Sequence, residues 1–134
     1  MTALDFFALR RGDELPPMRF EVSEEAARAY LDATGEPAEH WEGRVPPLAL
    51  GAVCLGELME RLPLPAGAVH TGQEFEFRGV VPAGRPVEAS VRVAQRSELR
   101  GAVIVALDLE LRCEGEPVVR GRATVMAPSS TGVS

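Results

Sequence analysis

The second half of the chain alternates apolar and polar residues, and this alternation constrains the fold more than any other feature. After Pro65 the period of two predicts four strands, near residues 70–79, 86–98, 102–114 and 117–126. Every second residue from Val103 to Leu111 is apolar, as a half-buried strand requires. Gly101 and Gly115 favour tight hairpin turns between strands. The sequence therefore predicts a long antiparallel meander.

The first half predicts one short strand and two helices. Residues 18–22 alternate at period two, and Ser23 and Gly35 are suited to begin and end a helix directly after them. A second helix should begin at Pro46-Pro47 and run to about Leu62. This helix is apolar nearly all round, so it must be buried. The segment between the helices keeps no period, and we expect an exposed loop there.

Gly51 and Gly56 weaken the second helix, so we expect a sheet, a partner helix or a ligand to approach its backbone closely. One buried helix followed by long antiparallel strands is buried best when the twisted sheet curls around it. The fold class is therefore α+β. We expect one domain over residues 1–127 and a flexible tail over 128–134.

The composition excludes several classes of function. The 134-residue chain has a net charge of -6 and a pI near 5.0, which leaves no basic patch for nucleic acid. No apolar run approaches the roughly 20 residues of a membrane span, so we expect a cytoplasmic protein. All 14 basic residues are arginine, and the absence of lysine excludes Schiff-base chemistry. Cys54 and Cys113 show no metal-ligand spacing and are typical of reduced core residues.

Short motifs along nearly the whole chain resemble successive landmarks of MaoC-like and related dehydratase domains. They are Gly12-Asp13-Glu14-Leu15-Pro16, Tyr30 with Ala33-Thr34-Gly35, Val45-Pro46-Pro47, His70 with Gly72-Gln73-Glu74-Phe75, Pro82 with Gly84, and Gly115-Glu116-Pro117-Val118. This resemblance implies a hotdog fold, in which a long antiparallel sheet curls around one helix, and a relationship to R-specific enoyl-CoA hydratases. It also implies an acyl-thioester substrate, with no metal and no cofactor other than the CoA of that substrate.

Active members of that family carry an Asp, four intervening residues and a His in the loop after the first helix. The pair holds the water that adds to an enoyl-CoA or leaves in the reverse direction. The matching positions here are Glu36 and His40, so Glu replaces Asp and the gap is one residue shorter. The resemblance makes Glu36 and His40 the candidate catalytic residues. The alternative is that both are solvated loop residues.

The resemblance also indicates substrate-binding positions. Trp41 could line an acyl or adenine pocket or anchor the loop, and His70 lies either near the thioester channel or in a structural hydrogen bond. Pro47, Leu48 and Gly51, in the first part of the buried helix, are further candidate substrate-binding positions. Backbone N–H groups at the start of this helix, such as those of Leu48 and Ala49, are the natural donors for a thioester oxygen. Proline contributes no N–H to such a site.

Three functions agree with these residues. The first is a hydratase or dehydratase of the MaoC-like class, acting on an acyl-CoA or acyl-carrier-protein thioester. The second is a hotdog thioesterase, and the third is a non-catalytic partner subunit or acyl-CoA-binding module. Hotdog domains usually join their sheets in dimers, so we expect a homodimer or a heterodimer with a related hotdog subunit.

Overall fold

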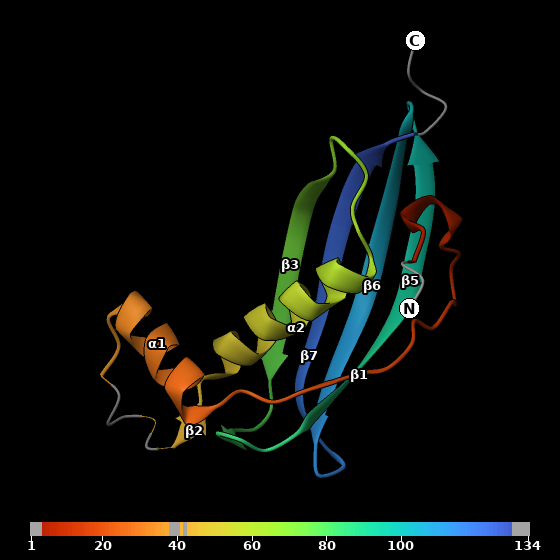
Figure 1. Ribbon diagram of the computed structural model, residues 1–134. Coiled ribbons are helices and arrows are strands. Elements are labelled where there is room, and N and C mark those ends of the chain that lie inside the picture. The colour runs from red at the N-terminus through yellow and green to blue at the C-terminus, as the bar shows by residue number, and fades with distance from the viewer. Residues whose placement is uncertain (1–3, 38–40, 42, 130–134) are drawn as a thin grey trace.

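The computed structural model describes residues 4–37, 41 and 43–129. Its elements, in chain order, are the 3-10 helix η1 (Phe6–Ala8), β1 (Met18–Phe20), α1 (Glu24–Thr34), β2 (Arg44–Val45), α2 (Pro47–Arg61), β3 (Val69–Phe77), β4 (Val81–Pro82), β5 (Val87–Leu99), β6 (Ala102–Cys113) and β7 (Glu116–Pro128). A five-stranded sheet carries α2 on one face (Figure 1). The predicted α+β architecture is confirmed. No helix among the described residues is long and apolar enough to cross a membrane.

The strand order is β1-β5-β6-β7-β3, which corrects part of the predicted meander. Strands β5, β6 and β7 do follow one another through tight turns, in which Arg100, Gly101, Glu114 and Gly115 all have positive φ. However, β3 pairs with β7 instead of β5. The reason lies in the connection after β3, where β4 pairs with β2 and carries the chain to the far side of the sheet. These two-residue strands are too short to show a period in the sequence.

Helix α1 begins and ends where its capping residues predict. The Ser23 side chain accepts a hydrogen bond from the Ala26 N–H at 3.0 Å. Gly35 adopts the left-handed conformation, with φ of 76°. Its N–H donates to Asp32 and the next N–H, from Glu36, donates to the Leu31 carbonyl. The backbone of Glu36 is therefore fixed by the end of α1.

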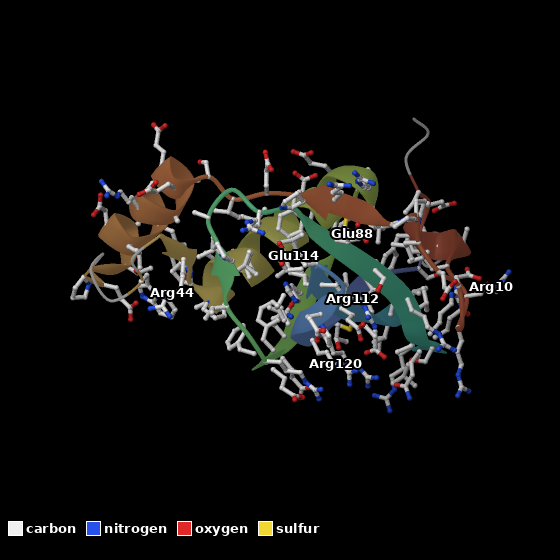
Figure 2. The ribbon with its side chains drawn as sticks, turned by 90° about the horizontal axis from the view of Figure 1, so that it is seen from below. Arg10, Arg44, Glu88, Arg112, Glu114 and Arg120 are labelled. Carbon is white, nitrogen blue, oxygen red and sulfur yellow. The ribbon has the colours of Figure 1, made fainter. Side chains whose placement is uncertain are left out.

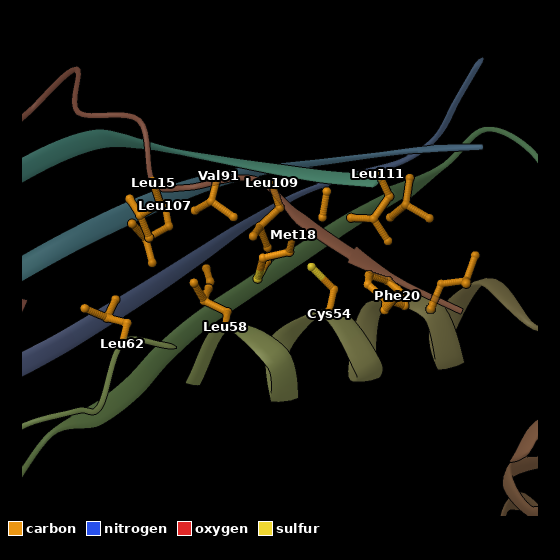
Figure 3. Packing of buried hydrophobic residues seen from close by; sticks show 14 of the residues in the cluster. Leu15, Met18, Phe20, Cys54, Leu58, Leu62, Val91, Leu107, Leu109 and Leu111 are labelled. Atoms are coloured by element: carbon orange, nitrogen blue, oxygen red, sulfur yellow. The ribbon is translucent and has the colours of Figure 1, made fainter. Parts of the chain in front are cut away.

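The core lies between α2 and the sheet. Cys54 and Leu58 of α2, and Leu62 directly after the helix, project toward Leu107 and Leu109 of β6 (Figure 3). All five are buried. The helix is thus buried against the sheet as its apolar character predicts.

Gly51 shows what approaches the backbone of α2. A Cβ built there would lie 2.6 Å from Cζ of Phe75, and one built on Gly121 of β7 would lie 2.7 Å from Cδ1 of the same ring. The Phe75 ring is therefore clamped between helix and sheet, which identifies a side chain of the sheet as the close neighbour. At Gly56 a Cβ would meet no atom of the described residues within 4 Å, so no part of the described chain approaches this glycine closely.

The face of the sheet turned away from α2 is covered by charged side chains (Figure 2). Arg122 makes two hydrogen bonds to Asp108, at 2.8 and 3.2 Å. Arg112 and Arg120 both pair with Glu110. These oppositely charged side chains are neighbours along β6 or across β6 and β7, and such pairs stabilise the sheet.

Candidate functional site

Glu36 lies on the surface directly after α1, and its side chain is held by another loop residue. The indole N–H of Trp41 donates a hydrogen bond of 2.7 Å to Oε2 of Glu36. The backbone N–H of Glu36 is hydrogen-bonded to α1, and its carboxylate is hydrogen-bonded to Trp41. These two bonds position both the backbone and the side chain of Glu36. The second member of the predicted pair, His40, lies outside the described residues.

Trp41 connects this carboxylate to the start of the central helix. Its ring is half-buried, and its carbonyl oxygen accepts from the backbone N–H of Arg44 at 2.7 Å and from Nε of Arg44 at 3.1 Å. Arg44 and Val45 form β2, and α2 begins two residues later at Pro47. Figure 1 shows α1, β2 and the N-terminal end of α2 gathered at one end of the molecule.

The first turn of α2 offers one backbone donor to a ligand. Pro47 has no N–H, and the N–H groups of Ala49 and Leu50 donate to the Pro46 carbonyl at 2.9 and 3.3 Å. The Leu48 N–H finds no acceptor among the described residues. Its side chain is 53% exposed. The positive end of the helix dipole adds to the attraction of this N–H for a developing negative charge.

The N-terminal end of α2 extends past the edge of the sheet. Helix α2 passes over β3 where Gly51 lies against the Phe75 ring, and its N-terminal part continues beyond this edge strand (Figure 1). Because the Phe75 ring fills the space beside Gly51, the helix face available to a substrate is that of Pro47 and Leu48. The structure thus brings Glu36, Trp41, Pro47 and Leu48 to one end of the domain.

His70 is exposed near the start of β3, at the end of the sheet opposite α1 and β2 (Figure 1). The structure therefore does not bring His70 to Glu36 within one chain. The β3–β7 register shifts between His70 and Gly72, so Thr71 is the extra residue of a β-bulge. His70 pairs with Val125, which is buried in the core, and so it lies on the α2 face of the sheet.

Solved structures share this fold. The (R)-hydratase from A. caviae involved in PHA biosynthesis matches with a TM-score of 0.73 at 22% identity, over 90% of this chain and 98% of that one. The MaoC-like dehydratase from Rhodospirillum rubrum matches with a TM-score of 0.78 at 20% identity, over 95% of this chain and 98% of that one. The HadBC (3R-hydroxyacyl-ACP dehydratase) complex from Mycobacterium tuberculosis matches with a TM-score of 0.67 at 23% identity, over 87% of this chain and 96% of that one. The chain has the hotdog fold. No family model and no curated sequence matches it.

The outer face of the hotdog sheet contains a groove of about 650 Å³ that is distinct from the candidate site. Its lining includes Ser90, Arg92, Asp108, Glu110 and Arg120. The carboxylates of Asp108 and Glu110 are already paired with arginines, and α2 lies on the other side of the sheet. Within the described part of the hotdog domain, no group of three or more His, Cys, Asp or Glu residues is placed to hold a metal ion.

Two features of the site were not predicted from the sequence. The Trp41–Glu36 hydrogen bond links residues five positions apart in a loop without a period, although an indole donor so near a carboxylate was a usable signal. The bulge at Thr71 has no sequence signature, and it decides which face of the hotdog sheet His70 occupies.

Proposed function

We propose that the protein is a MaoC-like hydratase or dehydratase of acyl thioesters, with Glu36 and His40 as its acid-base pair. The observation that carries the proposal is the Glu36 carboxylate, which Trp41 orients on the loop leading into the central helix of a hotdog fold. The sequence landmarks and the likeness of the fold to an (R)-hydratase and a MaoC-like dehydratase support the same reaction class.

In the hydration direction, one group of the pair removes a proton from water while the water oxygen bonds to C3 of the enoyl thioester. The electrons of the double bond then move onto the thioester, which becomes an enolate. The Leu48 N–H is the donor that fits the enolate oxygen. The other group of the pair gives a proton to C2, and the 3-hydroxyacyl thioester is complete. The reaction balances without a metal ion or a redox cofactor.

Substitution of the pair tests this proposal. Glu36→Gln and His40→Ala should each lower kcat for hydration of crotonyl-CoA by about a hundredfold or more, because each removes a proton-transfer group. The reaction is followed by the absorbance of the conjugated thioester. Glu39→Gln is the matched control, since it removes the same charge from the same loop and should leave turnover near the wild-type value. Wild-type turnover in Glu36→Gln would contradict the proposed role of this carboxylate.

A non-catalytic partner subunit is the second candidate, and three observations favour it. Glu36 is exposed, and Pro47 removes one N–H from the first turn of α2. The similar HadBC structure is a complex. Under this alternative the purified chain neither hydrates an enoyl-CoA nor releases free thiol from it, but it still binds a saturated acyl-CoA. Release of free thiol without hydration would instead identify a thioesterase.

The proposed assembly is a pair of hotdog domains joined at β3, either two copies or one copy with a related subunit. Strand β3 is an edge of the sheet, bonded only to β7 among the described strands. Val69 and Phe77, at its two ends, are 52% and 45% exposed. An open edge with exposed apolar residues favours addition of another strand.

A further inference from the structure

We infer that the ring of Phe75 restricts the candidate site to short acyl groups, because it closes the passage that leads from the first turn of α2 into the space between this helix and the sheet. The acyl thioester as substrate class rests on the proposed function. The closure of the passage rests on the packing of the ring alone. Phe75 is thus the residue that sets the acyl-chain length of the substrate.

An aromatic ring fills the passage where α2 passes over β3. A Cβ built on Gly51 of α2 would lie 2.6 Å from Cζ of Phe75, and one built on Gly121 of β7 would lie 2.7 Å from Cδ1 of the same ring. The ring therefore touches the bare backbone of both elements. Glycine inside a strand often marks a place where another group comes close to the backbone. Here that group is the Phe75 ring, which leaves no room for an acyl chain between the two glycines.

The ring is also held by other side chains. Phe75 packs against the buried core cluster, which includes Cys54 and Leu58 of α2. The Phe77 ring stacks on it, with 5.8 Å between the ring centroids and 27° between the ring planes, and such stacked pairs are favourable. Phe77 is the last residue of β3, at the end of the strand on the side of α1 and β2 (Figure 1). The two rings together close the passage on the side of the candidate site.

This passage is the apolar route away from the thioester carbon. Under the proposed function the thioester oxygen accepts from the Leu48 N–H, in the first turn of α2. Acyl carbons gain free energy when they leave water for an apolar environment. The Leu48 side chain is 53% exposed, whereas Leu50 and Cys54 are buried in the core between α2 and the sheet. An acyl chain is therefore drawn along α2 toward the sheet until it meets the Phe75 ring.

The distance between the first turn of α2 and the ring sets the length of this chain. Leu48 precedes Gly51 by three residues, or about 4.5 Å along the helix axis. An extended chain of single bonds advances about 1.2 Å per bond, since an extended residue spans at most about 3.6 Å over three bonds. About four bonds therefore fit before the chain meets the ring. We expect substrates with about four or five acyl carbons, such as a crotonyl thioester.

Enoyl-CoA substrates of different length test this limit in the wild-type protein. In a hydrophobic pocket, one methylene group too many is worth about 10- to 200-fold in kcat/KM. With a closed passage, kcat/KM for hydration should fall at least about a hundredfold from crotonyl-CoA to trans-2-octenoyl-CoA. Equal kcat/KM for the two substrates would overturn the inference and leave the proposed function standing.

Removal of the ring should open the passage. Phe75→Ala leaves a cavity of the kind that takes up an apolar ligand. The ratio of kcat/KM for trans-2-octenoyl-CoA to that for crotonyl-CoA should therefore rise at least about tenfold. Phe75→Leu removes less of the side chain and should raise the ratio less, and it takes the place of Phe75→Ala if circular dichroism shows that the latter does not fold. An unchanged ratio in the folded variant would overturn the inference.

Phe7→Ala is the matched control. Phe7, like Phe75, is half-buried and packs against the core, and its ring pairs with that of Phe6. It lies in η1, near the C-terminal end of α2, where the Leu4 N–H donates to the Arg61 carbonyl. Its loss should leave the ratio for the two substrates at the wild-type value. An equal rise in this control would assign the effect to a general loosening of the core, against the inference.

Binding measurements separate this inference from the proposed reaction. If the wild-type protein hydrates no enoyl-CoA, the proposed function fails, but titration calorimetry with butanoyl-CoA and octanoyl-CoA still tests the passage. The wild-type protein should bind octanoyl-CoA no more tightly than butanoyl-CoA. Phe75→Ala should bind octanoyl-CoA at least about tenfold more tightly than the wild type does, because more methylene groups leave water. Tighter binding of octanoyl-CoA than of butanoyl-CoA by the wild type, or no binding of either, would overturn the inference.

Discussion

The hydrogen bond from Trp41 to Glu36 is the contact that gives the exposed carboxylate a fixed direction. Trp41→Phe keeps an aromatic ring but removes the donor. We expect kcat to fall about fivefold, which corresponds to about 1 kcal/mol for one exposed hydrogen bond to a charged group. The thermal unfolding midpoint, followed by circular dichroism, should change little because both residues lie at the surface loop. An unchanged kcat would show that the bond does not orient the catalytic group.

Cys54 makes folding sensitive to alkaline pH. Burial raises the pKa of its thiol from 9.0 to about 12, and the charge of Glu57 acts in the same direction. Between these two values the unfolded chain loses a proton that the folded chain keeps, so stability falls as pH rises, by up to about 1.4 kcal/mol per pH unit. Urea unfolding at about pH 8 and about pH 10 measures this fall. In Cys54→Val this part of the fall should disappear; an equal fall in both proteins would refute the assignment.

At the scale of the helix, the two glycines of α2 should respond in opposite ways to the same change. Gly56→Ala meets open space and gains helix propensity, so the free energy of unfolding should rise by about 1 kcal/mol. Gly51→Ala places a methyl group against the Phe75 ring, and the ring cannot move away because its other side packs against Gly121. The free energy of unfolding of this variant should therefore fall by about 1–3 kcal/mol. Urea unfolding of both variants tests the clamp, and equal stabilisation would exclude it.

Most helices and strands could be predicted from local signals. Ser23 and Gly35 bound α1 as their capping chemistry requires, and the period of two located β5, β6 and β7. What lacked a local signal was missed: the short β2 and β4, and the bulge in β3. The sequence did not decide whether a sheet, a helix or a ligand lies against Gly51. Only the tertiary fold brings Phe75 of the sheet to this glycine.

At the scale of the whole molecule, the order of strands depends on which edge the chain reaches after a long connection. The alternation showed that β3 is a strand, but it carried no information that β7 would be its neighbour. The candidate site follows the same rule. Glu36 was predicted from its resemblance to the MaoC-like motif, and Pro47 and Leu48 from their place at the start of the second helix. The far position of His70 follows from the path of β3.

The open edge of β3 should control assembly. Lysine on an edge strand disfavours pairing, so Phe77→Lys and Val69→Lys should each shift the protein from dimer toward monomer in sedimentation equilibrium. Leu99→Lys is the matched control, because Leu99 is 62% exposed but lies at the turn between β5 and β6. Equal dissociation in the control, or none in the β3 variants, would place the interface elsewhere.

The central claim is that this hotdog domain adds water across the double bond of an acyl thioester. The most direct test is to incubate the purified protein with crotonyl-CoA and to identify the product by mass spectrometry. The account predicts a product heavier by one water with the thioester intact, namely a 3-hydroxyacyl-CoA. Free CoA together with the free acid, or unchanged crotonyl-CoA at every enzyme concentration, would contradict it.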